Sequence, residues 1–338
     1  MRISGERRFI RSSASGSSVE PMSHYEPLLD RAARHGAMRA AVVHPCDALA
    51  LESALAAKAA GLILPILVGN AAIVSQLARA RRLDLQGCEI VDAADSRDAA
   101  ALAVALARDG EVAAIVKGSL HSDELLRAIL APDSGLHTLR RLSHAYVIDF
   151  PKHPEPLLIT DAVVNITPSL DEKRDVVQNA VDLAHTLGIA EVRVALLSAI
   201  ESVNASVSST IDAAALAKMA ERGQITGAIL DGPLALDDAV DAAAAAEKGI
   251  VSPVAGRANV LVVPDFESGN MLAKALIHFA GAHAAGVVLG ARIPVALTSR
   301  ADSIPTHVAS IAIARLLVAE KAQVSLRAVP PPRATRRA

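Results

Sequence analysis

Two polar residues suited to anion chemistry follow an apolar run late in the chain. Thr298, Ser299 and Arg300 come directly after residues 295–297, and a segment of Ala, Ile and Leu with helical spacing follows them. The arginine side chain is a planar fork that matches phosphate oxygens, and a helix N-terminus binds anions through its unpaired N–H groups. The turn "LTSR" therefore predicts an anion site between a strand and a helix.

The start of that helix can be read from the same stretch. Pro305 fits the first helical turn, and Ser303 or Asp302 fits the cap. A purely structural arrangement, in which Arg300 pairs with Asp302 and Ser299 acts as a cap, is the alternative. The local sequence does not choose between them.

Other strand-to-helix turns carry similar residues. In "PDFESGN", Gly269 allows close backbone approach and Asn270 is expected to start a helix, although an ordinary turn with an Asn cap would look the same. In "VKGSLHSDELLRAIL", Lys117 is expected to end a strand, Ser122 resembles a cap, and Arg127 follows about a turn later. Lys117 is then either a phosphate ligand or a strand-end lysine.

Two further segments place polar groups among apolar ones. In "ILDGPLAL", Asp231 and Gly232 mark either a strand-end site or a turn. In "ITDAVVNITP", Asp161 and Asn165 need hydrogen-bond partners, so they form either a structural network or a site. Open α/β sheets bind ligands at the carboxyl ends of their strands, so these turns together predict an anion-binding cleft.

Several functional classes lack their sequence signals. The chain contains no G-x-G-x-x-G, G-x-x-x-x-G-K-[ST] or G-x-S-x-G motif, which disfavours dinucleotide enzymes, P-loop kinases and serine hydrolases. His278 and His283 are five residues apart, a spacing that does not stack them as zinc ligands on a helix. Cys46 and Cys88 show no metal-binding or redox spacing, so we expect two small thiols and no metal.

Composition sets the remaining limits. The 338 residues are 52% hydrophobic but only 2% aromatic, and the formal net charge is −2. With few rings to stack bases and dispersed Lys and Arg, a nucleic-acid groove is not expected. No apolar run is long enough to cross a bilayer, so we expect a soluble, cytoplasmic protein without a membrane partner.

Short apolar runs alternate with Ala-rich helical segments along most of the chain. This alternation predicts an α/β fold with mainly parallel sheets and helices on both faces. A less regular region, 132–170, has prolines at 151, 154 and 156 and suggests a domain crossing or an antiparallel edge. Residues 1–22, basic and Ser-rich, and residues 329–338 are expected to be tails.

Taken in order, "VKGSLHSDELLRAIL", "LSHAYVID", "ITDAVVNITP", "DGPLAL" and "VVPDFESGN…ALTSRADS" resemble the phosphate acetyltransferase/phosphate butyryltransferase family. The resemblance runs from about residue 25 to 325. It implies two α/β domains around a cleft, like isocitrate and isopropylmalate dehydrogenases. Domain one would comprise 23–152 plus 299–328, and domain two 153–298.

The resemblance also implies a reaction: acyl-CoA + phosphate ⇌ acyl phosphate + CoA, with coenzyme A as substrate, no cofactor, and commonly a homodimer. Carried over by position, Ser299 would bond the thioester or its oxyanion and Arg300 would neutralise phosphate. Gly269, Asn270 and Arg127 fall on the family's substrate-binding motifs. The family's carboxylate, proposed to take the thiol proton, falls on Thr306, and Asp302 is the nearby substitute.

Two other functions remain as alternatives. One is a sensor that binds acyl-CoA or acyl phosphate without turnover, suggested by Thr306. The other is an NAD- and metal-dependent hydroxy-dicarboxylate dehydrogenase of the same fold, which would need clustered aspartates at the strand ends. The acyl chain length, between acetyl and butyryl, is not readable, because one methylene changes discrimination only modestly.

Overall fold

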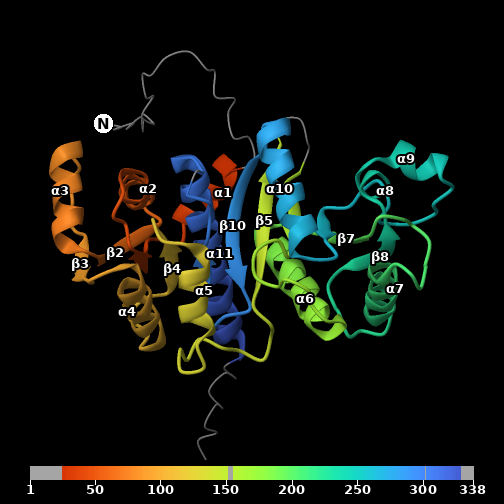
Figure 1. Cartoon of the computed structure of the whole chain (residues 1–338), viewed down its shortest axis with the longest axis horizontal. Helices are drawn as coiled ribbons and strands as arrows, with labels where there is room; N and C mark the ends of the chain where they lie inside the picture. Colours follow the sequence, from red (N-terminus) through yellow and green to blue (C-terminus); the bar gives the residue numbers. More distant parts are fainter. Residues whose placement is uncertain (1–24, 151–154, 301, 329–338) are drawn as a thin grey trace, which may run out of the picture.

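A single sheet of eleven strands organises the described residues of the computed structural model, which are 25–150, 155–300 and 302–328 (Figure 1). The sheet order is β3-β2-β1-β4-β11-β10-β5-β6-β9-β7-β8. The strands are β1 (Met38–Val43), β2 (Ile63–Gly69), β3 (Glu89–Asp92), β4 (Ala114–Lys117), β5 (Ser143–Asp149), β6 (Leu157–Thr160), β7 (Arg193–Leu197), β8 (Ile229–Leu234), β9 (Val260–Val262), β10 (His283–Leu289) and β11 (Val295–Ala296). The prediction of a mainly parallel α/β fold is confirmed, but one sheet runs through both predicted domains.

The sheet contains two parallel halves that run in opposite directions. Strands β3, β2, β1, β4 and β11 are parallel, and so are β6, β9, β7 and β8. Between them, β10 is antiparallel to both β11 and β5, and β5 is antiparallel to β6. The carboxyl ends of the strands therefore share one edge of the sheet only within each half.

Strand register nevertheless brings the ends of the two halves to the middle of the sheet. Pairing across the central strands places one residue from each on a common row: Val116, Ala296, Val287, Ala145, Thr160 and Val262. Both β11 and β6 end on this row, three strand spacings apart, which is about 14 Å at the usual spacing. The turns that follow leave the row in opposite directions.

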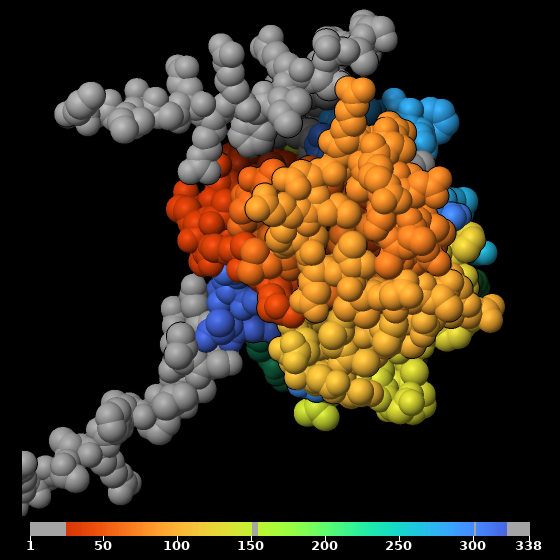
Figure 2. Space-filling model, turned by 90° about the vertical axis from the view of Figure 1, so that its left-hand side faces the viewer, coloured from red at the N-terminus to blue at the C-terminus, as the bar shows by residue number. Residues whose placement is uncertain are grey.

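Helices cover both faces, and the central strands are correspondingly buried on both sides. One face packs against α1 (Tyr25–Ala33), α2 (Ala48–Ala59), α3 (Ala71–Arg81), α6 (Leu170–Leu187), α7 (Ser208–Glu221) and α11 (Ile304–Ala328). The other packs against α4 (Ser96–Arg108) and α5 (Ser122–Leu130) in the first half, and α8 (Leu236–Val240), α9 (Ala242–Glu247) and α10 (Phe266–Ala280) in the second. Figure 2 shows that the first third of the chain forms the surface at the β3 end.

The last helix, α11, returns to the first half of the chain. It contacts α1 and α2 and lies over β10 and β11 at the centre of the molecule (Figure 1). It also contacts α6 of the second half. The domain limits themselves stay a prediction; the proposed tails, and Pro151 and Pro154 near the boundary, lie outside the described residues. Among the described residues, no helix is both long and apolar enough to cross a membrane.

Candidate active site

The turn after β11 is held by its own side chains. The Asp302 carboxylate accepts the Ser299 backbone N–H at 2.8 Å, and the Ser303 hydroxyl accepts the Thr306 N–H at 3.4 Å. Helix α11 begins at Ile304, so Pro305 occupies its first turn, where the missing N–H has no cost. The predicted strand, cap and helix start are confirmed, with Ser303 as the cap.

Arg300 lies exposed beside the start of a second helix, α5. One of its terminal nitrogens is 3.4 Å from Nδ1 of His121, the residue just before α5. No ion pair with Asp302 is found among the described residues. The prediction that Ser122 caps α5 is wrong by one residue, since Ser122 is already helical and His121 makes no side-chain cap.

A buried lysine lies close to Arg300. Lys117 ends β4, the strand next to β11, and only 5% of it is exposed. Burial, and to a smaller extent the charge of Arg300, lowers the pKa of Lys117 to about 8. The predicted strand-end position of Lys117 is confirmed. Lys117 and Arg300 are close enough for the charge of one to affect the pKa of the other.

His307 joins this group from the first turn of α11. Its Nε2 lies 3.2 Å from the Ser299 carbonyl oxygen, and it is 8% exposed. Burial lowers the pKa of His307. Burial raises the pKa of Asp302, and the nearby charges of His307, Lys117 and His278 partly offset that rise. Sequence reasoning missed both His121 and His307. For His307 the available signal was a polar residue in the first turn of an otherwise apolar helix, a signal that does not apply to His121 before α5.

A small polar cavity lies beside these groups. It has about 10 Å³, close to the least volume that holds one water molecule, and its lining includes Ser53, Lys117, Thr298, His307 and Ser310. The Ser53 hydroxyl is buried without a hydrogen-bond partner among the described residues. The cavity therefore has room for about one water molecule next to Ser53.

Asp161 and Asn165 form a second group, at the end of β6. The Asp161 carboxylate accepts the backbone N–H groups of Val163, Val164 and Asn165 at 2.9–3.2 Å and the Asn165 amide at 2.5 Å. Burial raises the pKa of Asp161, and these hydrogen bonds oppose the shift. Of the two predicted arrangements, the structure shows the satisfied network.

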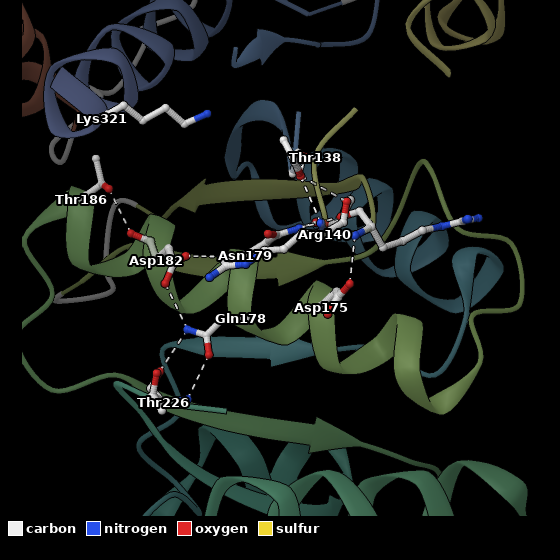
Figure 3. Close-up of polar contacts among 12 residues, drawn as sticks. Thr138, Arg140, Asp175, Gln178, Asn179, Asp182, Thr186, Thr226 and Lys321 are labelled. Atoms are coloured by element: carbon white, nitrogen blue, oxygen red, sulfur yellow. Dashed lines mark hydrogen bonds and ion pairs between the residues drawn. The ribbon is translucent and has the colours of Figure 1, made fainter. Parts of the chain in front are cut away.

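Arg141 extends this network toward α6. Its Nε donates to the Asn165 side-chain oxygen at 2.8 Å, and its backbone N–H donates to Asp175 at 3.0 Å. Figure 3 shows the preceding loop fixed on α6, where Arg140 pairs with Asp182 and Asn179 donates to the Arg141 carbonyl at 2.9 Å. The Asp161 loop is thus tied to the segment before β5 and, through Arg141, to α6.

Helix α10 packs directly on the Asp161 loop. It begins at Phe266 with Asp265 as its cap, so the prediction that Asn270 starts or caps the helix is wrong. A Cβ at Gly269 would lie 2.7 Å from Val263 Cγ2 and 3.1 Å from the Asp161 carbonyl oxygen. Glycine is needed here for close packing, and Asn270 donates to the Ala162 carbonyl at 3.2 Å.

Three predicted residues lie outside both groups. Arg127 is exposed on α5 and pairs with Asp123 at 3.3 Å. Asp231 and Gly232 lie within β8, an edge strand, so their prediction as a strand end or turn is wrong. The strand continues because Gly232 fits against Leu196, where a Cβ would come within 2.7 Å. Six strand spacings, about 29 Å, separate β8 from β11.

Metal-ligating side chains are scattered over the described part of the chain. No three His, Cys, Asp or Glu side chains gather there in a way that could hold an ion. The predicted lack of a metal and of a cofactor remains a prediction.

Comparison with known proteins shows which family the chain resembles. Residues 95–315 match the family model described as "Phosphate acetyl/butaryl transferase". The chain is 53% identical to a phosphate acetyltransferase of Rhizobium meliloti over 307 residues, 91% of this chain and 97% of that protein. It is 38% identical to a phosphate butyryltransferase of Clostridium beijerinckii, over 88% of this chain and 98% of the other.

A solved structure agrees in fold as well. The branched-chain phosphotransacylase from Enterococcus faecalis V583 superimposes with a TM-score of 0.72 at 28% identity, over 83% of this chain and 99% of that one. The sequence motifs, the family model and the solved relative all point the same way: the chain belongs to the phosphate acetyltransferase/phosphate butyryltransferase family.

Proposed function

We propose that this protein is a phosphate acyltransferase that moves a short acyl group reversibly between coenzyme A and inorganic phosphate. One observation carries the assignment within the family: the exposed Arg300 and the buried Lys117 lie together at the N-terminus of α11, beside Ser299. Two cations and a helix N-terminus are the groups that neutralise a phosphate dianion.

Each residue of the turn then has a role. The guanidinium of Arg300 binds two phosphate oxygens through its fork, and the ammonium of Lys117 adds a point charge. The Ser299 hydroxyl donates to the acyl oxygen, on which negative charge develops in the tetrahedral transition state. Asp302 fixes the turn through the Ser299 N–H.

The reaction proceeds by direct attack in a ternary complex. In the direction of acyl-CoA synthesis, the thiolate of coenzyme A attacks the acyl phosphate carbonyl, the C–S bond forms and the C–O bond to phosphate breaks. A thiol with a pKa of about 8.5 needs only modest help from a base to ionise near neutral pH, so most of the barrier lies in aligning two anionic substrates and stabilising the oxyanion.

The substrates lie in a cleft between the two halves, in an arrangement like that of isocitrate dehydrogenase. The common row of strand ends supports this, because it brings the turns after β11 and β6 to the centre of the sheet. Asn270 and the Asp161–Asn165 loop line the part of this cleft across the common row from Arg300, and Arg127 on α5 lies at the rim, where it contacts the long anionic body of coenzyme A. Asp231 and Gly232 are too far along the sheet to reach the reacting atoms.

A sensor function is the second candidate, favoured by one observation. Thr306, at the position of the family's carboxylate, is 4% exposed and its hydroxyl lies 3.1 Å from that of Ser303. Thr306 offers no base, so a sensor would bind coenzyme A without turnover.

The thioester assay separates the two. Purified protein is mixed with coenzyme A and acetyl, propionyl or butyryl phosphate, with EDTA present, and absorbance near 233 nm is followed. Turnover with any of them establishes phosphate acyltransfer, and the ranking gives the acyl preference. Coenzyme A binding without turnover of any of the three would refute the enzyme and support the sensor.

A homodimer in the cytoplasm completes the proposal. Apolar side chains exposed on α10 support the dimer, since Met271 is 65% and Phe279 is 91% exposed. Light scattering measures the mass of the particle in solution: the mass of two chains would support the dimer, and the mass of one chain would refute it.

A further inference from the structure

The proposed reaction needs a group that takes the proton of the coenzyme A thiol, and the residue at the family's position cannot do so. We propose that His307 is this base, and that Asp302 stabilises the positive charge it acquires. The inference rests on the proposed function and adds a catalytic residue to it.

Hydrogen bonding fixes the tautomer of His307. A carbonyl oxygen cannot donate, so the 3.2 Å contact with the Ser299 carbonyl requires a proton on Nε2. In the neutral ring the lone pair is then on Nδ1. No described residue is hydrogen-bonded to Nδ1, so this nitrogen is left to accept a proton. The bond also holds the ring against the backbone of Ser299, the residue before Arg300, where the acyl phosphate is proposed to bind.

Other candidates next to the turn fit the role less well. Thr306 has only a hydroxyl, which is buried against Ser303. Asp302 already accepts the Ser299 N–H. Even with a raised pKa, a carboxylate starts from about 3.9, against about 6.5 for histidine and 8.5 for the thiol. Burial moves the two pKa values toward each other, so the choice between them rests on the hydrogen bond that already occupies Asp302 and on the unbonded Nδ1 of His307.

The surroundings of His307 keep the ring neutral before the reaction and stabilise it once it is protonated. Burial is the main influence on its pKa and lowers it, so the ring is neutral and able to accept a proton at neutral pH. Asp302 and Asp47 favour the protonated ring, whereas Lys117 opposes it. Nearby carboxylates thus stabilise the imidazolium by their charge, without a hydrogen bond to the ring.

The proposed step balances without any added reagent. The thiol proton passes to Nδ1 of His307 as the thiolate sulfur bonds to the carbonyl carbon of the acyl phosphate. The bond between that carbon and the phosphate oxygen breaks, and the leaving phosphate takes the proton from His307. The products are acyl-CoA and hydrogen phosphate.

The test replaces His307 in two ways. In His307→Gln, the amide nitrogen can still donate to the Ser299 carbonyl, but no base remains; in His307→Asn that donor is lost as well. His185→Gln is the matched control, since His185 Nε2 also lies next to a backbone carbonyl, that of Gly227 at 2.7 Å, but on α6. Rates are measured from pH 6 to 9 with the acyl phosphate that the wild type turns over fastest.

We expect His307→Gln to lower kcat/KM for coenzyme A by about 30-fold at pH 7, because only about 3% of a thiol with a pKa of about 8.5 is ionised there. Its KM for acyl phosphate should stay near the wild-type value. Between pH 6 and 8 its kcat/KM should rise about tenfold per pH unit, because only pre-ionised thiol reacts. The wild type should be nearly level over this range, and His185→Gln should match it.

Two results overturn the inference while leaving the proposed function intact. One is an active wild type whose His307→Gln variant keeps its rate within about threefold. The other is a His307→Gln variant whose loss is the same at every pH, which would make His307 only a positioning residue for Ser299. An inactive wild type would instead remove the proposed function, and this inference with it.

Discussion

Arg300 offers the most direct test of the proposed phosphate site. Arg300→Ala removes the charged fork from the N-terminus of α11 without touching a buried contact, since Arg300 is exposed. Losing one preorganised donor to a developing charge costs about 3 kcal/mol. At 1.36 kcal/mol per tenfold change, kcat/KM for phosphate should fall about 100-fold.

Lys117 makes the size of this loss depend on pH. The charge of Arg300 contributes to the lowered pKa of Lys117, about 8, so Arg300→Ala should raise that pKa. Near pH 7 Lys117 is mostly charged in both the wild type and Arg300→Ala, so the full loss of kcat/KM appears. Near pH 9 the wild type has lost the lysine charge while the variant keeps more of it. The deficit should therefore shrink as the pH rises.

Initial rates of acyl phosphate formation, measured from pH 7 to 9 at several phosphate concentrations, check both points. Arg300→Lys should recover less than about tenfold, because a point charge does not reproduce bidentate contact. Arg222→Ala, an exposed arginine at the end of α7, serves as the control. Activity of Arg300→Ala close to the wild type, in folded protein, would refute the assignment of the phosphate site.

Two further changes test the supporting structure. Gly269→Ala should destabilise the protein by about 1–3 kcal/mol through overpacking of α10 on Val263 and the Asp161 loop, measured by thermal unfolding; an equal shift for Lys274→Ala on the same helix would contradict this. The positive charge of Lys117 is present below its pKa of about 8 and is lost above it, so KM for phosphate should rise as the pH passes 8. In Lys117→Met the same KM should be high throughout and lack that rise.

Much of the local structure could be predicted from the sequence. Alternating apolar runs and Ala-rich segments gave the α/β class, because strands buried on both faces and helices packed on them have distinct periods. Lys117 at a strand end, and Ser303 and Pro305 at a helix start, depend on neighbouring residues only, and they were predicted correctly. The ordered motifs also identified the family. Where a helix start depended on packing, as at α10, the prediction failed by four residues.

What the tertiary structure decided is which of these turns lie together. Strand direction and register are set by pairing between segments far apart in the chain, so the sequence did not reveal that the sheet reverses at β10 and β5. That reversal separates Ser299 and Arg300 from the Asp161 loop, and it leaves Asp231 on a distant edge. Burial likewise decided the chemistry of the site. Nothing in the sequence marks Lys117 or His307 as unusual. Their pKa values are lowered mainly because the folded chain removes them from water, and to a smaller extent because it brings other positive charges near them.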